Sequence, residues 1–394
     1  MFIMILKQLF KVFFPLLNFI QIGVLICSFY FFRIFRKLFS PIDYVFGVAE
    51  IANNLKYLSS TFENSEVVCF YTNKFYSNNN YDYAIYSSNK HFTYLIRFIY
   101  GPVLLGFLMN KSKTFFYIWN KGFLFNRKYE FYFLKKKNLK LILFYCGDDI
   151  RSPFLSMNYT NSIGVDNHLS YVDNHIKKNQ EEIVKIEASL ADQYADLIFS
   201  AKLDQISYIN KKVFSPPYSY PKSKFNSNTD KFNFENPIVI VHAPSSPVVK
   251  GTQLVRAAIK KLELEGYDFE YIELIDKSND EVLSTLSRSH IALNAFYGYG
   301  NGIGLFGVEA MANMNCLMMS INDDYDNEKV SINDVIFNTK YWEIDKKLKF
   351  LLDNPNEIKK MALSGYDFTL NNFEEEKAKI KYQKIIKDFS EQKL

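Results

Sequence analysis

The sequence predicts an α/β protein with two doubly wound domains, each built on a parallel sheet with helices on both faces. Short, continuous apolar runs alternate with amphipathic stretches over most of the 394 residues, as expected for strands buried on both faces of a sheet. A polar segment, 216–237, interrupts this alternation and divides the chain into halves of similar size. Hydrophobic residues make up 48% of the chain, which suffices for two cores.

The first half, residues 41–220, is expected to form one Rossmann-like domain. We expect strands at 42–48, 66–72, 114–119, 139–147 and 195–201, and helices at 49–62 and 181–194.

The second half is expected to form a similar domain over 237–370, after a linker at 221–236. We expect strands at 237–243, 268–275, 290–295 and 316–320, and helices at 251–265, 279–288 and 304–313. Two such domains face a central cleft, and a ligand binds at the carboxyl ends of the strands.

Residues 1–40 differ from both halves. No charged side chain occurs from Val12 to Phe32, and a helix of this length spans ~30 Å, about one hydrocarbon core. Basic residues flank the segment on both sides, so they do not indicate an orientation. We expect a membrane-associated helix that either spans the bilayer or lies in its plane; the alternative is a helix packed on the soluble body.

The last segment, 371–394, is expected to contain an amphipathic helix over 371–389 that packs back across both domains. Its apolar residues at helical spacing are Phe373, Ile380, Ile385 and Phe389. The alternative is a solvated tail with charge pairs.

The composition excludes some classes of protein. A net charge of +5 without clustered basic residues argues against nucleic-acid binding. The four cysteines, Cys27, Cys69, Cys146 and Cys316, lie far apart in or beside apolar runs, so we expect buried, reduced thiols and no zinc site.

The stretch "IVIVHAPSSPVVKGTQLVR" predicts a strand ending at His242, a loop, and a helix that opens at Lys250 and Gly251. Backbone N–H groups at a helix start, with a lysine beside them, suit a diphosphate. His242 is a further candidate for this site, and the alternative is a loop histidine bonded to backbone. For Lys250 the alternative is a solvated surface lysine.

The stretch "FYGYGNGIGLFGVEAMA" predicts a glycine-rich loop that leads into a helix. Gly302 and Gly304 allow the backbone to approach phosphate oxygens closely. Glu309 lies just past the first helical turn, where a carboxylate can accept both hydroxyls of a ribose. The alternative for Glu309 is a favourable acid near a helix N-terminus.

From Val239 to Ser320 the chain resembles the nucleotide-binding domain of group 1 glycosyltransferases with the GT-B fold. "VHAPSSPVVKGT" and "GLFGVEAMA" match that family's phosphate loop and its glycine loop followed by "EAMA". The resemblance implies that Lys250 contacts the donor diphosphate, that Gly302 and Gly304 line the phosphates, and that Glu309 holds the ribose.

Two positions depart from the family pattern. The family often has two glutamates with seven residues between them, and Asn301 stands where the first would be, near the donor sugar. Ser245 stands where the phosphate loop usually has an arginine. The family resemblance therefore still implies nucleotide binding. The two departures put the contacts to the donor sugar and turnover in doubt.

The stretch "LKLILFYCGDDIRSPF" resembles a cleft-facing turn in the first domain of the same family. Asp148, Asp149 and Arg151 are thus candidates for acceptor contacts or cleft closure, together with Asn301 on the catalytic side. A metal-binding Asp-x-Asp motif of the GT-A fold is the rival interpretation; the two acids are adjacent, and Arg151 opposes a cation. "DDYD" at 323–326 has that spacing but is expected in a solvated loop.

The predicted function is transfer of a sugar from a nucleoside-diphosphate sugar to a glycan or lipid-linked glycan, for polysaccharide biosynthesis at the cytoplasmic face of the membrane. The resemblance implies a retaining, metal-independent reaction without a cofactor. Two alternatives stay open: a nucleotide-sugar 2-epimerase with the same fold, and a non-catalytic nucleotide-sugar-binding or scaffolding protein at the membrane.

Overall fold

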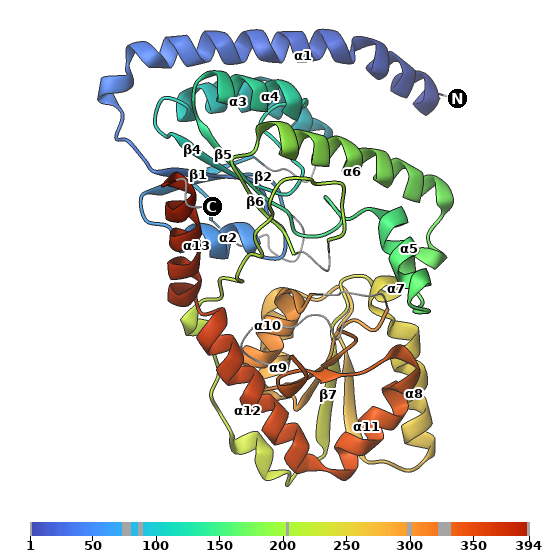
Figure 1. Cartoon of the computed structure of the whole chain (residues 1–394). Helices are drawn as coiled ribbons and strands as arrows, with labels where there is room; N and C mark the ends of the chain where they lie inside the picture. The colour runs from blue at the N-terminus through green and yellow to red at the C-terminus, as the bar shows by residue number, and fades with distance from the viewer. Residues whose placement is uncertain are drawn as a thin grey trace. The chain divides into compact units, whose positions relative to one another are not determined.

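The chain forms two compact units. The computed structural model describes residues 2–72, 80–85, 90–201, 205–297, 302–321 and 332–391. Unit 1 comprises residues 1–149, 186–200 and 209–214, and unit 2 comprises 150–185, 201–208 and 215–394. Figure 1 shows the elements of each unit.

Unit 1 contains a six-stranded sheet in the order β3-β2-β1-β4-β5-β6, and every strand pair is parallel. The strand order reverses between β1 and β4, as in a doubly wound fold. The strands are β1 (Tyr44–Ala49), β2 (Ser65–Tyr71), β3 (Tyr83–Ala84), β4 (Thr114–Ile118), β5 (Lys140–Phe144) and β6 (Leu197–Phe199).

Helices that belong to unit 1 include two long apolar ones that pack against each other, α1 and α3. The unit 1 helices are α1 (Phe2–Ile34), α2 (Asn54–Ser60), α3 (Lys90–Leu108) and α4 (Arg127–Lys136). Helix α6 (Asn174–Tyr194) begins in unit 2 and ends in unit 1, just before β6. Asn126 caps the start of α4, because its side chain accepts the amide hydrogen of Lys128.

Unit 2 contains a five-stranded parallel sheet in the order β11-β10-β9-β7-β8. Here β8 lies on one side of β7 and β9 on the other, so the order reverses between β7 and β9. The strands are β7 (Ile238–His242), β8 (Phe269–Glu273), β9 (Ile291–Leu293), β10 (Cys316–Met319) and β11 (Phe337–Asn338). The two predicted parallel-sheet domains are confirmed.

One helix of unit 2, α5, precedes these strands, and the others connect or follow them. The unit 2 helices are α5 (Pro153–Ser162), α7 (Pro247–Lys250), α8 (Thr252–Leu264), α9 (Asn279–Arg288), α10 (Gly304–Ala312), α11 (Ile344–Asp353), α12 (Pro355–Asn372) and α13 (Glu375–Ser390). Short 3-10 turns link them, such as His168–Tyr171 before α6. Ser278 starts α9 through a capping box with Glu281.

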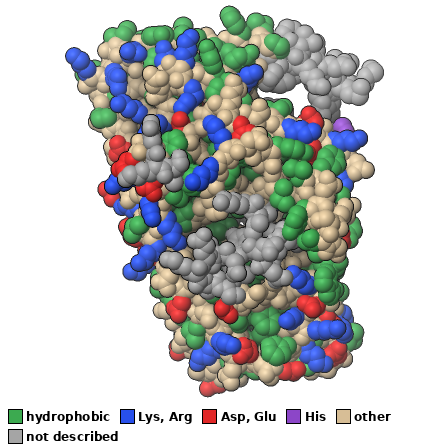
Figure 2. Space-filling view, in the orientation of Figure 1, with side chains coloured by type: hydrophobic (Ala, Val, Ile, Leu, Met, Phe, Trp, Pro, Cys, Tyr) green, Lys and Arg blue, Asp and Glu red, His purple; other side chains and the backbone are tan. Residues whose placement is uncertain are grey.

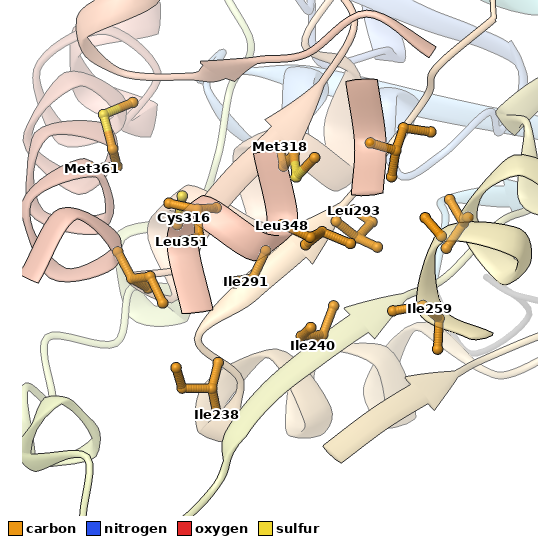
Figure 3. Packing of buried hydrophobic residues seen from close by; sticks show 14 of the residues in the cluster. Ile238, Ile240, Ile259, Ile291, Leu293, Cys316, Met318, Leu348, Leu351 and Met361 are labelled. Carbon is orange, nitrogen blue, oxygen red and sulfur yellow. The ribbon is translucent and has the colours of Figure 1, made fainter. Parts of the chain in front are cut away.

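One large layer of the core of unit 2 lies on one face of its sheet. Side chains from β7, β9 and β10 pack there against α8, α11 and α12, as Figure 3 shows. Ile240, Ile291 and Met318 are fully buried between these layers. Val241, Ala292 and Leu317 point to the other face and are also fully buried, so both faces are covered and the strands are continuous apolar runs in the sequence.

Two sequence expectations are wrong. Ile380 is 62% exposed, because Ala378 and Tyr382 form the buried side of α13 and a residue midway between them points to the opposite side. Phe373 lies before this helix, which starts at Glu375. Cys27 is exposed, whereas Cys69 and Cys316 are buried as expected and Cys146 is half-buried.

Candidate nucleotide site in unit 2

The reversal point of the unit 2 sheet is where the two glycine-containing loops meet. The loop after β7 leads through α7 to Gly251, and the loop after β9 leads to α10. Because β7 and β9 are adjacent and parallel, their carboxyl ends lie at the same edge of the sheet. A doubly wound sheet binds ligands at this point.

Lys250 is tied to the second of these loops. Its ammonium group donates a hydrogen bond to the side-chain oxygen of Asn294, at 3.2 Å. The amide nitrogen of the same Asn294 side chain donates to the carbonyl oxygen of Ile303, at 2.9 Å. Ile303 directly precedes α10, so Asn294 links the lysine to the N-terminus of that helix. A cation and a helix N-terminus together form an anion site.

Gly251 makes the close approach of the two loops possible. Its φ of +72° lies in the left-handed region, where a side chain is strained. A Cβ at this position would also lie 3.3 Å from the Tyr297 ring and 3.4 Å from the Cβ of Phe296. Glycine is thus favoured here by the backbone conformation, and a Cβ would in addition require a small shift of the Tyr297 ring.

The described part of the glycine loop includes Gly302 and Gly304. Gly304 begins α10 with a φ of +66°, and a Cβ there would meet no atom of the described residues within 4 Å, so its requirement is conformational. Gly302 is half-buried beside it. Asn301 lies outside the described residues, as do Gly298 and Gly300 and the "DDYD" segment.

Glu309 is a buried carboxylate on α10. The side-chain amide of Asn279, the first residue of α9, donates to its Oε1 at 2.9 Å. Burial raises the pKa of Glu309 to about 7, and the Asn279 hydrogen bond and the charge of Lys224 oppose that rise. A carboxylate has two oxygens that can each accept more than one hydrogen bond, so it suits a pair of hydroxyl donors.

Both ring nitrogens of His242 have hydrogen-bond partners within unit 2. Its Nδ1 lies 2.9 Å from the carbonyl oxygen of Leu293, and its Nε2 lies 2.9 Å from the hydroxyl of Thr252. Burial lowers the pKa of His242 to about 4, so the ring is neutral at pH 7 and has one N–H, which Leu293 accepts. Nε2 then accepts from Thr252. This geometry favours the histidine bonded to backbone over a direct phosphate contact.

Asp149 holds the turn after β5. Its carboxylate accepts the amide hydrogens of Cys146 and Gly147, the latter at 2.7 Å, and it is fully buried. Burial raises its pKa to about 7 despite these hydrogen bonds. Asp148 beside it is exposed. Arg151 is half-buried and belongs to unit 2, whereas both acids belong to unit 1.

The sheet of unit 1 also places polar groups at its reversal point, between β1 and β4. Glu50 follows β1 and accepts from the amides of Leu55 and Lys56 and from the hydroxyl of Tyr81. Burial raises the pKa of Glu50 to about 7. Lys121 follows β4 and is half-buried, and burial lowers its pKa.

Sequence reasoning missed Asn294, Asn279 and Glu50. Asn294 and Glu50 each follow an apolar strand directly and are almost fully buried. A polar residue at the carboxyl end of a buried strand was the available signal, since that edge binds ligands in doubly wound sheets. Asn279 had a weaker signal, its place next to the helix cap at Ser278.

No protein-family model and no curated protein sequence matches this chain. Solved structures do. HepE from Anabaena, in complex with UDP, matches 88% of this chain over 100% of its own, with a TM-score of 0.55 and 10% identity.

Two further structures match at similar levels. An alpha-glucosyltransferase in complex with UDP-glucose and DNA matches 89% of this chain over 100% of its own, with a TM-score of 0.51 and 11% identity. A glycosyltransferase from Rickettsia africae matches 88% of this chain over 98% of its own, with a TM-score of 0.50 and 13% identity. At such identities the likeness shows the fold, which is GT-B, as the sequence predicted.

Proposed function

We propose that the protein transfers a sugar from a nucleoside-diphosphate sugar to a hydroxyl group of an acceptor. The observation that supports this most is the Lys250–Asn294–Ile303 connection at the reversal point of the unit 2 sheet. It places a cation next to the N-terminus of α10, which is suited to two adjacent phosphates. The matching structures support the proposal because one of them is a complex with UDP and another a complex with UDP-glucose.

In the proposed reaction, Lys250 and the first amides of α10 bind the donor diphosphate. The bond between the anomeric carbon of the sugar and the diphosphate breaks while the acceptor hydroxyl oxygen bonds to that carbon. Negative charge develops on the departing diphosphate, which then takes up the proton of the acceptor hydroxyl. The lysine and the helix N-terminus stabilise that charge as it develops. Asn294 keeps the lysine oriented towards the helix through its own hydrogen bond to Ile303.

Glu309 binds the ribose of the donor in this proposal. Its carboxylate accepts hydrogen bonds from the two ribose hydroxyls, and Asn279 fixes the orientation of the carboxyl group. The resemblance to group 1 glycosyltransferases supports these roles. It also supports retention at the anomeric carbon and a reaction that needs no metal.

The acceptor is proposed to be a glycan or lipid-linked glycan at the cytoplasmic face of a membrane. Asp148, Asp149, Arg151 and Asn301 are proposed to act on the acceptor or sugar side. Of these, Asp149 supports the turn through its bonds to Cys146 and Gly147, so it positions its neighbours.

Donor binding is tested by thermal melting of the full chain with UDP, GDP, ADP and their sugars. A nucleotide that binds the native state raises its melting temperature. We expect one nucleotide to do so in the wild type and the effect to disappear in Glu309→Ala. Glu263→Ala is the matched control, because this glutamate lies exposed on α8. If no nucleotide raises the melting temperature, the proposed nucleotide site is wrong.

Turnover is tested by incubation with the labelled donor and candidate acceptors. Transfer of the label supports the proposed reaction. Isomerisation of the donor supports a 2-epimerase in its place. Binding without either product supports a non-catalytic nucleotide-sugar-binding protein.

A further inference from the structure

Helix α1 faces its own unit with polar side chains. Asn18, Gln21 and Ser28 are buried against unit 1, together with Leu25 and Phe29. The opposite side of the same helix is exposed and apolar. We call this side the outer face; its members are Leu16, Phe19, Ile20, Ile26, Cys27, Tyr30, Phe31 and Ile34, with Leu38 just beyond the helix.

This arrangement is the reverse of that expected for a surface helix in water. Such a helix places its apolar stripe on the core and its polar residues in solvent. In α1 the outer-face residues recur at spacings of three and four, with the exposed Gly23 between Ile20 and Ile26, so they form one stripe along the helix. Pro15–Ile34 is also long and apolar enough to cross a membrane, with only 22% of its most apolar window buried.

The buried polar side chains fix α1 lengthwise on unit 1. Gln21 donates to the carbonyl oxygen of Phe98 in α3 at 3.0 Å and accepts from the amide of Phe125 at 2.9 Å. Asn110 donates to the carbonyl oxygen of Phe29 at 3.0 Å. A helix that left α3 to span a bilayer would take these polar groups into hydrocarbon without partners.

Helix α3, on which α1 packs, also exposes apolar side chains and buries a charged one. Arg97 is buried and donates to the carbonyl oxygens of Gly122 and Leu124. Among its residues from Tyr94 onward, together with Phe92, the exposed ones are apolar or aromatic: Phe92, Tyr94, Leu95 and Ile99. Two helices in contact thus both expose apolar side chains, which is more than scattered surface hydrophobics explain.

Positive charge accompanies the outer face. Arg33 lies in the last turn of α1, and Arg36 and Lys37 lie just after the helix. The first acidic residue of the sequence is Asp43. The neighbouring α4 exposes Lys128, Tyr129 and Tyr132. Figure 2 shows hydrophobic side chains with Lys and Arg among them along the edge of unit 1 that α1 forms. Basic and aromatic side chains around an apolar stripe match an anionic lipid surface.

We propose that α1 lies flat in the interface of an anionic bilayer, with its outer face in the lipid and its polar side on unit 1. The protein is then attached to one leaflet and does not cross the membrane. This inference goes beyond the nucleotide-sugar reaction and is independent of it, since donor binding to unit 2 does not involve α1.

Attachment is tested by co-sedimentation of the full chain with vesicles of phosphatidylcholine containing about 30% phosphatidylglycerol. Ile34→Ser with Leu38→Ser removes residues that are 76% and 80% exposed on the outer face. We expect at least a tenfold lower partition coefficient. Ile380→Ser with Leu264→Ser is the matched control, at 62% and 78% exposure in unit 2, and should bind like the wild type. Equal binding of both double variants would overturn the proposal.

The orientation is tested with a fluorophore on single cysteines along the outer face. The natural Cys27 provides the middle position, and Ile20→Cys and Ile34→Cys, each with Cys27→Ser, provide the others; Cys146→Ser removes the half-buried thiol. Positions 20 and 34 are separated by ~21 Å along the helix axis. Lipids with quenchers at shallow and deep positions should report one shallow depth for all three.

Other results would overturn the flat orientation. A steady change in depth from position 20 to position 34 would mean that the helix spans the bilayer. No quenching at any position, with a dimer in solution, would mean that a second copy covers the outer face. Melting with the donor nucleotide on the same samples separates these outcomes from a failure of the proposed reaction.

Discussion

The ammonium group of Lys250 lies 3.2 Å from the side-chain oxygen of Asn294, and this hydrogen bond joins the loop after β7 to the loop after β9. The two residues are far apart in sequence and meet because β7 and β9 are adjacent in the sheet. Asn294 is buried and also bonds to Ile303, so the lysine is held beside the start of α10 by a fixed partner.

We expect Lys250→Ala to weaken binding of the nucleoside diphosphate by roughly 10- to 100-fold, since a hydrogen bond from a charged group contributes about 1.5–3 kcal/mol. Affinity for the corresponding uncharged nucleoside should change little, because Lys250 is proposed to contact the phosphates alone. Isothermal titration measures both. Lys260→Ala, an exposed lysine on α8, is the control. An equal loss for nucleoside and diphosphate would place Lys250 elsewhere in the site.

Donor affinity should depend on pH through Glu309. The folded protein holds a proton on this carboxyl up to a pKa of about 7. If the ionised form accepts the ribose hydroxyls, affinity rises as pH increases through that value and then levels off. A nucleoside-diphosphate sugar is the ligand of choice for this titration, because its diphosphate keeps a constant charge there.

In Glu309→Gln the pH dependence of donor affinity should be flat over the same range, with weaker binding above the wild-type pKa. Gln keeps the size of the side chain and an oxygen for Asn279, so loss of packing does not explain the difference. A wild type without pH dependence, or a variant that retains it, would assign the titration to another group.

The sequence allowed prediction of both parallel sheets, because strands buried on both faces are continuous apolar runs. Helices α3 and α4 were not predicted. Arg97 interrupts the apolar pattern of α3 and is nevertheless buried, since the carbonyl oxygens of Gly122 and Leu124 accept its hydrogens. Such long-range partners are not visible in a local pattern.

For the candidate site, sequence patterns identified Lys250, Gly251 and Glu309 by type and spacing. The residues that contact these side chains could be identified only from the fold. Asn279 reaches Glu309 from a different loop, and Thr252 bonds His242 from the start of the next helix. Periodicity places a residue on an element, but it does not say which side chain from another element faces it.

Ligand-free stability should also respond to Glu309. Its pKa is raised in the folded state, so folded protein retains a proton that the unfolded chain loses between about pH 4.5 and 7. Stability therefore falls as pH rises through this range, and above it the full cost of a buried charge is present. Glu309→Gln should melt higher than wild type by several degrees at about pH 8 and show little difference at about pH 4.5.

This second test of Glu309 uses differential scanning calorimetry without ligand, followed on the transition of unit 2. The opposite sign, a variant less stable than wild type at high pH, would mean that the ionised carboxylate is stabilised by its surroundings. Lys224 and Asn279 would then outweigh burial.

The packing of α1 on α3 depends on Gly106. A Cβ at this position would lie 2.7 Å from the Cβ of Ser28 and 2.8 Å from the backbone nitrogen of Phe29. Gly106→Ala must push the helices apart or distort them, which costs about 1–3 kcal/mol in a packed interface. Gly-to-Ala replacement also favours a helix by roughly 0.5–1 kcal/mol, and this gain must be separated from the clash.

Gly23→Ala measures the gain in helix propensity alone, because Gly23 lies in α1 and a Cβ there would meet no atom of the described residues within 4 Å. We expect Gly23→Ala to raise the free energy of unfolding of unit 1 and Gly106→Ala to lower it, as measured in urea. Adding Ser28→Gly to Gly106→Ala removes the nearer clash and should recover part of the loss. If Gly106→Ala stabilises as much as Gly23→Ala, α1 is not seated on α3, and the polar side of the helix has no fixed partner.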